Sequence, residues 1–281
     1  MRASLDARLT SAATELGIDP GPLRRRLVFQ RILRRIGPVD SWVLKGGFLL
    51  ETRLRQGFRS TRDLDLVTDL AHDLETLTRE LERLMSADPD DDFFIFRITG
   101  TRPLADDTAG RRGWKISLDA MLDGRPFDRV RLDVMQRFEE TSGGREMVAI
   151  SPPIRGLGLA VADVQSVDLA QHAAEKLHAL TKMYAGERVS TRVKDLVDLT
   201  LMLEAGFLPD SRLRQRLTAV FASRDGGLPP MGLPTPAARW SSDFTTLVTG
   251  TPAAGVTLEQ AFAAVSEMYA NAVHGDERDL T

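Results

Sequence analysis

Apolar and polar residues alternate at every second position in much of the first half of the chain, the period of a β-strand with one buried face. In one such segment Trp114, Ile116 and Leu118 share a face. An Asp123-Gly124 pair joins this segment to the next and predicts a two-residue hairpin turn. The strands predicted from this pattern are Arg62–Val67, Phe93–Gly100, Gly113–Leu122 and Phe127–Met135.

Apolar residues at helical spacing predict helices around these strands and throughout the second half of the chain. Three fall in the first half, at Ser4–Ile36, Phe48–Gly57 and Ala71–Met85. Four follow, at Ser166–Met183, Ser190–Gly206, Asp210–Ser223 and Thr257–Val273. The predicted fold class is therefore α/β (α+β). A mixed sheet flanked by helices occupies residues 1–155, and an all-helical domain occupies residues 156–281.

Composition narrows the class of protein. The 281 residues are 42% hydrophobic and 27% charged, which is typical of a globular protein of one or two domains. The formal net charge of −3 gives no overall attraction to nucleic acid, so any such binding needs a local basic patch. The absence of cysteine excludes disulfides and thiol catalysis and fits a cytoplasmic protein. We expect no signal peptide and no membrane-spanning segment, because no apolar run is long enough.

Two aspartates in the strand Arg62–Val67 raise a question about charge. Residues two apart on a strand point the same way, so Asp63 and Asp65 share a face while Leu64 and Leu66 pack on the other. Side-by-side carboxylates repel each other unless a cation lies between them. Magnesium meets this need with oxygen ligands and keeps positions open for phosphates.

A third acid and a glycine pair complete a candidate site. Asp133 stands on the polar face of its strand, and three acids on adjacent strands could hold two Mg²⁺ ions roughly 4 Å apart. Gly46 and Gly47 precede a helix, where bare backbone N–H groups face an anion. A single Asp-x-Asp is more often a solvated strand end, and a single Gly-Gly more often a loop. Their order along the chain carries the functional interpretation.

Five motifs in this order resemble the AbiEii/AbiGii nucleotidyltransferase-like toxins of the DNA polymerase β-type superfamily. They are KGGFLLETRL, RSTRDLDLV, VRLDVM, AEKLHAL and RVKDLVDL, and the resemblance runs from about Leu23 to Gly206. It implies an α/β nucleotidyltransferase domain followed by a helical domain, and a toxin from a bacterial toxin–antitoxin or phage-defence pair. The implied cofactor is Mg²⁺ or Mn²⁺, with a nucleoside triphosphate (NTP) as substrate. The implied partners are a tRNA 3′ end as acceptor and a cognate antitoxin.

The resemblance also implies roles for individual residues. It assigns Gly46 and Gly47 to the phosphates, although the wider superfamily has serine where Gly47 stands. The implied metal ligands are Asp63, Asp65 and Asp133, and the implied catalytic set is Asp63, Asp65, Lys176 and Asp198. Lys176 and Asp195 also belong to the implied nucleotide-binding set.

The helical motifs have a plainer interpretation as well. Lysine occurs at only five positions in this arginine-rich chain, and Lys176 has the compact ammonium that suits phosphate. Without the resemblance, Glu175, Lys176 and Lys182 would form a solvated helix face. Lys194 and Asp198 could likewise be an ordinary i, i+4 pair. The four histidines show no metal-ligand spacing, and we expect His178 to lie on the helix surface or to pack.

Two groups of arginines could hold an RNA backbone. One surrounds the glycine–acid segment, Gly46 to Asp65. The other lies on the helix at Arg24–Arg35, where a solvated basic face is an equal alternative. The first group is Arg53, Arg55, Arg59 and Arg62, and the second is formed by the run RRRLVFQRILRR.

The favoured function is a Mg²⁺-dependent nucleotidyltransferase toxin that transfers a nucleoside monophosphate from an NTP to RNA. Two alternatives stay open. One keeps the chemistry and changes the acceptor to a protein or small molecule. The other is a catalytically inactive binding module of the same fold.

Overall fold

The computed structural model describes residues 2–54, 61–104, 112–136, 144–184, 188–189, 192–207 and 211–274. Its contacts divide the chain into two compact units. The first consists of Met1–Leu49, Ser60–Phe138 and Arg145–Ser166, and the second of Leu50–Arg59, Glu139–Gly144 and Val167–Thr281.

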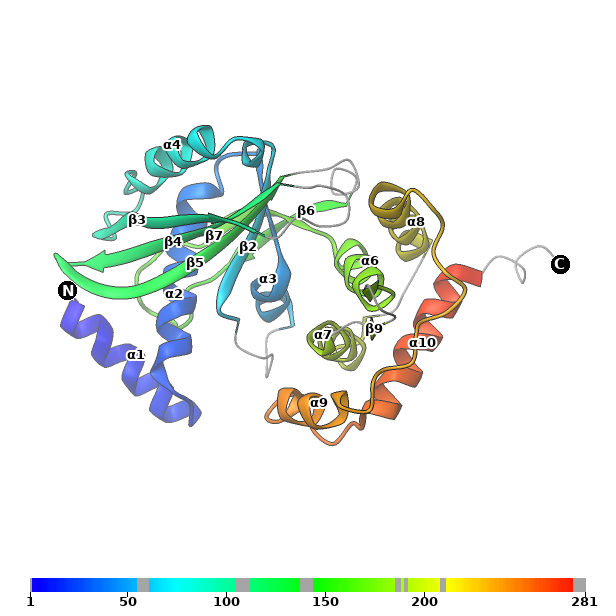
Figure 1. The fold of residues 1–281 in the computed structure, drawn as a ribbon. Coiled ribbons are helices and arrows are strands. Elements are labelled where there is room, and N and C mark those ends of the chain that lie inside the picture. The colour runs from blue at the N-terminus through cyan, green and yellow to red at the C-terminus, as the bar shows by residue number, and fades with distance from the viewer. Residues whose placement is uncertain are drawn as a thin grey trace. The chain divides into compact units, whose positions relative to one another are not determined.

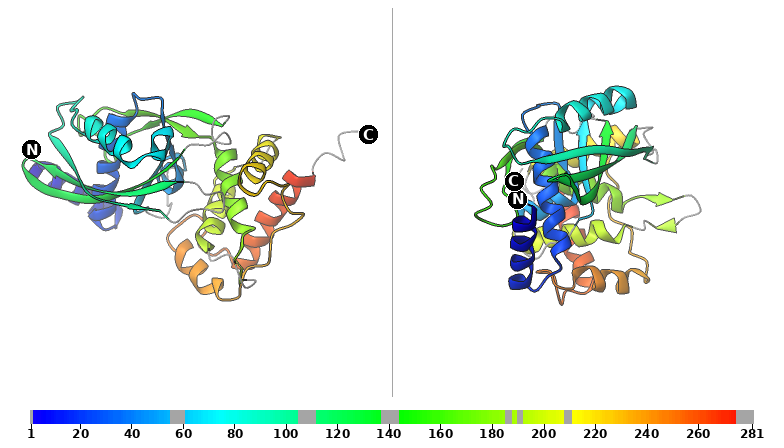
Figure 2. Two further views of the ribbon diagram at one scale, coloured as in Figure 1. Left: turned by 45° about the horizontal axis from the view of Figure 1, so that its top comes forward. Right: turned by 90° about the vertical axis from the view of Figure 1, so that its left-hand side faces the viewer.

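A seven-stranded mixed sheet forms the centre of the first unit, with strand order β3-β4-β5-β2-β1-β7-β6. Strand β4 runs antiparallel to both β3 and β5, and these three strands form a long twisted layer (Figures 1 and 2). The pairs β2–β5 and β1–β7 are parallel, and β1–β2 is antiparallel. The bounds are β1 Trp42–Lys45, β2 Asp63–Thr68, β3 Phe94–Pro103, β4 Gly113–Leu122, β5 Arg125–Gln136, β6 Arg145–Ile150 and β7 Ala162–Val167.

Helices cover the apolar face of this sheet. α2 (Pro20–Ile36) packs against β5 and α4, and α4 (Leu74–Met85) packs against β3 (Figure 1). The strands turn Leu64, Ile116 and Leu132 toward this core, and each is fully buried. α1 (Arg2–Leu16), a 3₁₀ turn at Asp69–His72, and α3 (Gly46–Arg53), which begins in this unit, complete the helices described for it.

The basic helix α2 is neither an RNA track nor a solvated face over its second half. Arg31 and Arg35 are buried, and their guanidinium groups contact Asp92 at 3.5 and 2.8 Å. Arg31 and Arg34 also pair with Asp90, at 2.8 and 3.1 Å. These ion pairs tie α2 to the acidic loop before β3. Both interpretations of these arginines as exposed groups are therefore wrong.

Asp92 is the centre of this ion-pair network. Burial by itself would raise its pKa, but the hydrogen bonds and charge of Arg35 outweigh that effect and lower the pKa of Asp92. The carboxylate therefore stabilises the fold above the ordinary aspartate pKa. That contribution is lost as the pH falls through the lower folded-state value.

The regular elements described for the second unit are helices and one short antiparallel pair of strands, β8 (Met183–Tyr184) and β9 (Arg188–Val189). α6 (Leu169–Leu180) packs against α7 (Val193–Glu204) and α8 (Ser211–Asp225). α9 (Trp240–Val248) and α10 (Leu258–His274) pack against α7 (Figure 2). Trp240 lies in their shared apolar core.

The α/β fold class predicted from the sequence is confirmed, with corrections at particular elements. The predicted strands and hairpin form β2 to β5. The predicted helix Ser4–Ile36 is two helices, because Gly17 turns at φ +65° and Asp19 then caps α2. The helix predicted at Ser166–Met183 is the shorter α6, which Asp168 caps, because Ser166 belongs to β7. Strands β1, β6 and β7 and helix α9 were not predicted.

Among the described residues, no helix is both long enough and apolar enough to cross a membrane.

Replacement of Asp92 by asparagine tests the buried network. Asp92→Asn removes the buried carboxylate that Arg31 and Arg35 share. Arg31 keeps its pair with Asp90, but Arg35 loses its 2.8 Å partner, so the free energy of unfolding should fall by about 3 kcal/mol. Urea unfolding at pH 7 measures this change. Glu80→Gln, which breaks a surface pair with Arg83, is the matched control and should unfold close to the parent. An Asp92→Asn protein as stable as the parent would contradict a structural role for the network.

Candidate functional site

A row of charged residues crosses four neighbouring strands of the sheet. The strand register places Lys45 of β1 opposite Asp65 of β2, Asp65 opposite Asp133 of β5, and Asp133 opposite Lys115 of β4. Residues in register on adjacent strands point to the same face. Two carboxylates therefore stand side by side between two ammonium groups, on the face opposite the apolar core.

Asp63 belongs to the same face, two residues before Asp65. The Lys115 ammonium lies 2.5 Å from Asp133 Oδ1 and 3.6 Å from Asp63 Oδ2, so it spans the two carboxylates. Arg131 Nε approaches Asp63 Oδ1 at 2.8 Å. The structure thus brings together the three acids predicted from the sequence, with two cations balancing their charge.

The donor set of this row fits a hard divalent cation. Asp63 Oδ1 and Asp133 Oδ1 are buried atoms that accept no hydrogen bond, although cationic groups stand beside them. Carboxylate oxygens are the ligands that Mg²⁺ and Mn²⁺ take. Among the described residues, no three His, Cys, Asp or Glu side chains already form a metal-holding group, and here Lys115 spans two of the acids. A metal bound here would take over the charge balance that Lys115 provides.

Gly46 is required by the position of Asp65. Its φ is +72°, in the left-handed region that favours glycine. A Cβ placed on Gly46 would lie 1.9 Å from Asp65 Oδ2. The first residue of α3 therefore leaves the space that the Asp65 carboxylate fills. Gly47 follows within the first turn of the same helix.

The second unit holds the other predicted residues in a separate cluster. The Lys176 ammonium on α6 donates hydrogen bonds to Asp198 Oδ2 at 2.6 Å and to Asp195 Oδ1 at 3.1 Å, both on α7. Burial opposes the charged form of Lys176, but the two carboxylates outweigh it and raise its pKa. Lys176 is only 9% exposed, so the solvated-face interpretation is wrong for this residue. Asp198 pairs with Lys176 rather than with the exposed Lys194.

His178 is a packing residue, one of the two roles that the sequence allowed. It is buried, its ring meets Phe221 edge-on at 4.8 Å, and its Nε2 lies 3.0 Å from Asp225 Oδ2. Burial, with repulsion from Arg224 and Lys182, lowers the pKa of His178 to about 4. Near neutral pH the imidazole is uncharged and holds α6 to α8.

The arginines near the glycine–acid segment are only partly described. Arg53 ends α3 and Arg62 is exposed directly before β2. Arg55 and Arg59 lie outside the described residues.

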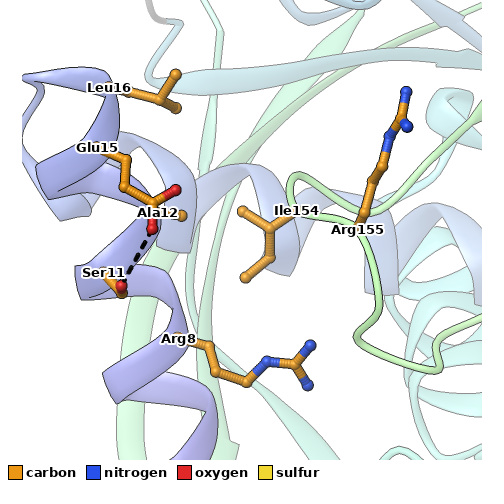
Figure 3. A pocket seen from close by; sticks show the side chains of 7 residues that line it. All are labelled: Arg8, Ser11, Ala12, Glu15, Leu16, Ile154 and Arg155. Atoms are coloured by element: carbon orange, nitrogen blue, oxygen red, sulfur yellow. Dashed lines mark hydrogen bonds between the residues drawn. The ribbon is translucent and has the colours of Figure 1, made fainter.

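A shallow open cavity of about 410 Å³ lies elsewhere in the first unit, between α1 and the loop after β6 (Figure 3). Arg8, Glu15, Ile154 and Arg155 are among its lining residues, and no predicted site residue is.

Sequence reasoning missed the cations of the strand site. Lys115 was visible as one of five lysines, on a strand predicted to pair with the strand of Asp133. A regular hairpin about Asp123-Gly124 would place Lys115 opposite Leu132. The register shifts by one residue between Ala120 and Met121, which moves Lys115 opposite Asp133. That irregularity had no clear signal in the sequence.

Comparison with known proteins agrees with this architecture. Residues 28–270 match the model of a family described as nucleotidyl transferase AbiEii toxin of type IV toxin–antitoxin systems. Among solved structures, the chain is similar to MenT4, a nucleotidyltransferase toxin from Mycobacterium tuberculosis H37Rv. The TM-score is 0.54 at 21% identity, over 89% of this chain and 81% of that one, a likeness that shows a shared fold. No curated protein sequence matches significantly. The resemblance inferred from the motifs is confirmed.

The fit between Gly46 and Asp65 yields a stability prediction. Gly46→Ala should lower the free energy of unfolding by about 2 kcal/mol or more, because the new methyl group meets the carboxylate at a positive φ. Chemical denaturation of both proteins measures the difference. Gly100→Ala is the control, since a Cβ there meets nothing within 4 Å. Equal losses in the two variants would show that the space beside Asp65 is not constrained.

Proposed function

Since this chain belongs to the AbiEii family of nucleotidyltransferase toxins of type IV toxin–antitoxin systems, we propose that it transfers a nucleoside monophosphate from an NTP to the 3′ end of an RNA, with tRNA as the acceptor. Family membership implies a cognate antitoxin. The proposed substrates place its action in the cytoplasm, and blocked translation would be the toxic outcome.

The observation that carries this proposal is the pairing of Asp65 with Asp133 across β2 and β5, with Asp63 on the same face. Three carboxylates that converge on an open strand face suit phosphoryl-transfer chemistry, which depends on positioning and charge neutralisation. We assign Asp63, Asp65 and Asp133 as the residues that would hold Mg²⁺ or Mn²⁺. The bound cation would supply charge neutralisation for the phosphates and a more acidic acceptor hydroxyl.

The chain's own residues position the reactants. The acceptor 3′-hydroxyl oxygen forms a bond to the α-phosphorus of the NTP as the bond from that phosphorus to the bridging oxygen breaks. Pyrophosphate leaves, and the hydroxyl proton is released to solvent or a carboxylate. Lys115 and Arg131, which balance the acids in this structure, are placed to pair with phosphate oxygens instead. Backbone N–H groups of Gly46 and Gly47 at the start of α3 would face the triphosphate.

We extend the proposal to Lys176, Asp195 and Asp198, which the family resemblance assigns to nucleotide binding and catalysis. The raised pKa of Lys176 keeps its ammonium charged, as a group that neutralises phosphate must be. Its buried ion pairs also hold α6 to α7. Any variant at Lys176 therefore needs a measurement of unfolding beside the measurement of NTP affinity.

To test this proposal, the full chain is incubated with each α-labelled NTP, Mg²⁺ and tRNA. The measurement is the label incorporated at the RNA 3′ end. Asp65→Asn should reduce transfer by about a thousandfold or more, because loss of one carboxylate removes several kcal/mol of stabilisation. The control is Asp123→Asn, at a positive-φ turn position where asparagine is well tolerated. It should transfer label as the parent does.

The outcomes separate the proposed function from its alternatives. Label on a protein instead of RNA would show that the acceptor is a protein. NTP binding without transfer to any acceptor would show that the chain is a catalytically inactive binding module. Full transfer by a folded Asp65→Asn protein would show that the strand acids are not part of the catalytic site.

A further inference from the structure

The face that carries the acids extends beyond them over β5, β4 and β3 as a basic surface. Its first row continues from Asp133 through Lys115 to Arg102 at the sheet edge. The second contains Arg131, in register with Ser117. The third places Asp119 between two arginines, Arg97 on β3 and Arg129 on β5. We call Arg97, Arg102, Lys115, Arg129 and Arg131 the basic strand face.

The charge of this face is opposite to that of the whole chain. On β3, β4 and β5 this face carries five basic residues against two acids, Asp119 and Asp133. Asp63 and Asp65 of β2 bring the acids to four, whereas the chain has a formal net charge of −3. Asp119 is itself paired with Arg129, at 2.6 Å from Nε to Oδ1. Arg97, Arg102 and Arg129 are exposed. Positive charge is therefore concentrated beside the carboxylates and not spread over the molecule.

The surface is larger than an NTP triphosphate needs. Lys115 and Asp119 are four positions apart along β4, about 13 Å at the strand rise, and the two spacings between three strands add about 10 Å across. Guanidinium groups spaced over such an area match successive phosphates of a nucleic-acid strand. An exposed strand face is also a common platform for single-stranded RNA, because unpaired bases can lie flat on it.

We propose that the basic strand face binds the single-stranded acceptor end of the RNA, with Arg97, Arg102 and Arg129 on its phosphates and the 3′-hydroxyl at the row of acids. This inference rests on the proposed RNA acceptor and deepens it. It also moves the RNA path away from α2, whose Arg31 and Arg35 are buried in ion pairs.

The test measures binding of a labelled single-stranded RNA at several KCl concentrations. The full chain is used in EDTA without NTP, so that binding is separate from catalysis. The double variant Arg97→Ala/Arg102→Ala removes two exposed guanidinium groups outside the row of acids. The logarithm of its binding constant should fall less steeply with log[KCl] by about 1.4, since each phosphate contact on a single strand contributes about 0.7. RNA affinity at low salt should fall at least tenfold.

The control removes the same charge elsewhere. Arg79→Ala/Arg83→Ala on α4 deletes two arginines with largely exposed side chains, and its salt slope should match the parent's. In transfer assays the Arg97/Arg102 variant should raise KM for RNA and leave KM for NTP unchanged.

Two different failures can be told apart. If the parent labels RNA but the Arg97/Arg102 variant keeps the parent's salt slope and KM for RNA, the basic strand face is not the RNA site and the proposed function stands. If the parent neither binds nor labels RNA, the proposed acceptor is wrong and this inference is wrong with it.

Discussion

The compensation of carboxylate charge on the strand face is the constraint on which the rest of the site depends. The register of β2 and β5 sets Asp65 beside Asp133, and strand alternation adds Asp63 to the same face. Such a group is stable only with positive charge among its members. In this structure Lys115 and Arg131 supply that charge. In the proposed reaction a divalent cation would balance the carboxylates instead, so that Lys115 and Arg131 could pair with phosphate oxygens.

Other features of the first unit keep this strand face in position. Gly46 lacks the side chain that would displace the Asp65 carboxylate. On the opposite face, Leu64 and Leu132 anchor the acid-bearing strands in the core under α2. The buried ion pairs of Arg35 with Asp92 connect α2 to the loop before β3. β3 carries Arg97 and Arg102, so the same connection positions the outer part of the basic strand face.

Much of this arrangement could be predicted from the sequence, because it depends on local periodicity. Alternation along Phe127–Met135 placed Asp133 on the polar face, and Asp123-Gly124 gave the hairpin. What could not be predicted depends on contacts distant in sequence. The one-residue shift near Ala120 aligned Lys115 with Asp133. Arg31 became buried because its partner Asp90 arrives 59 residues later. Strand β1 has only four residues, too few to show a period.

The central proposal is that the row of acids binds a divalent cation, which would compete with the ammonium of Lys115 for the same carboxylates. Mn²⁺ affinity, followed by electron paramagnetic resonance without NTP or RNA, tests it most directly in the parent, Asp65→Asn and Lys115→Met proteins. Removal of the competing ammonium should tighten Mn²⁺ binding in Lys115→Met by roughly tenfold, since a unit charge a few Å away is worth on the order of 1 kcal/mol or more. Asp65→Asn should bind Mn²⁺ much more weakly than the parent. Equal Mn²⁺ affinity in all three proteins would contradict the account.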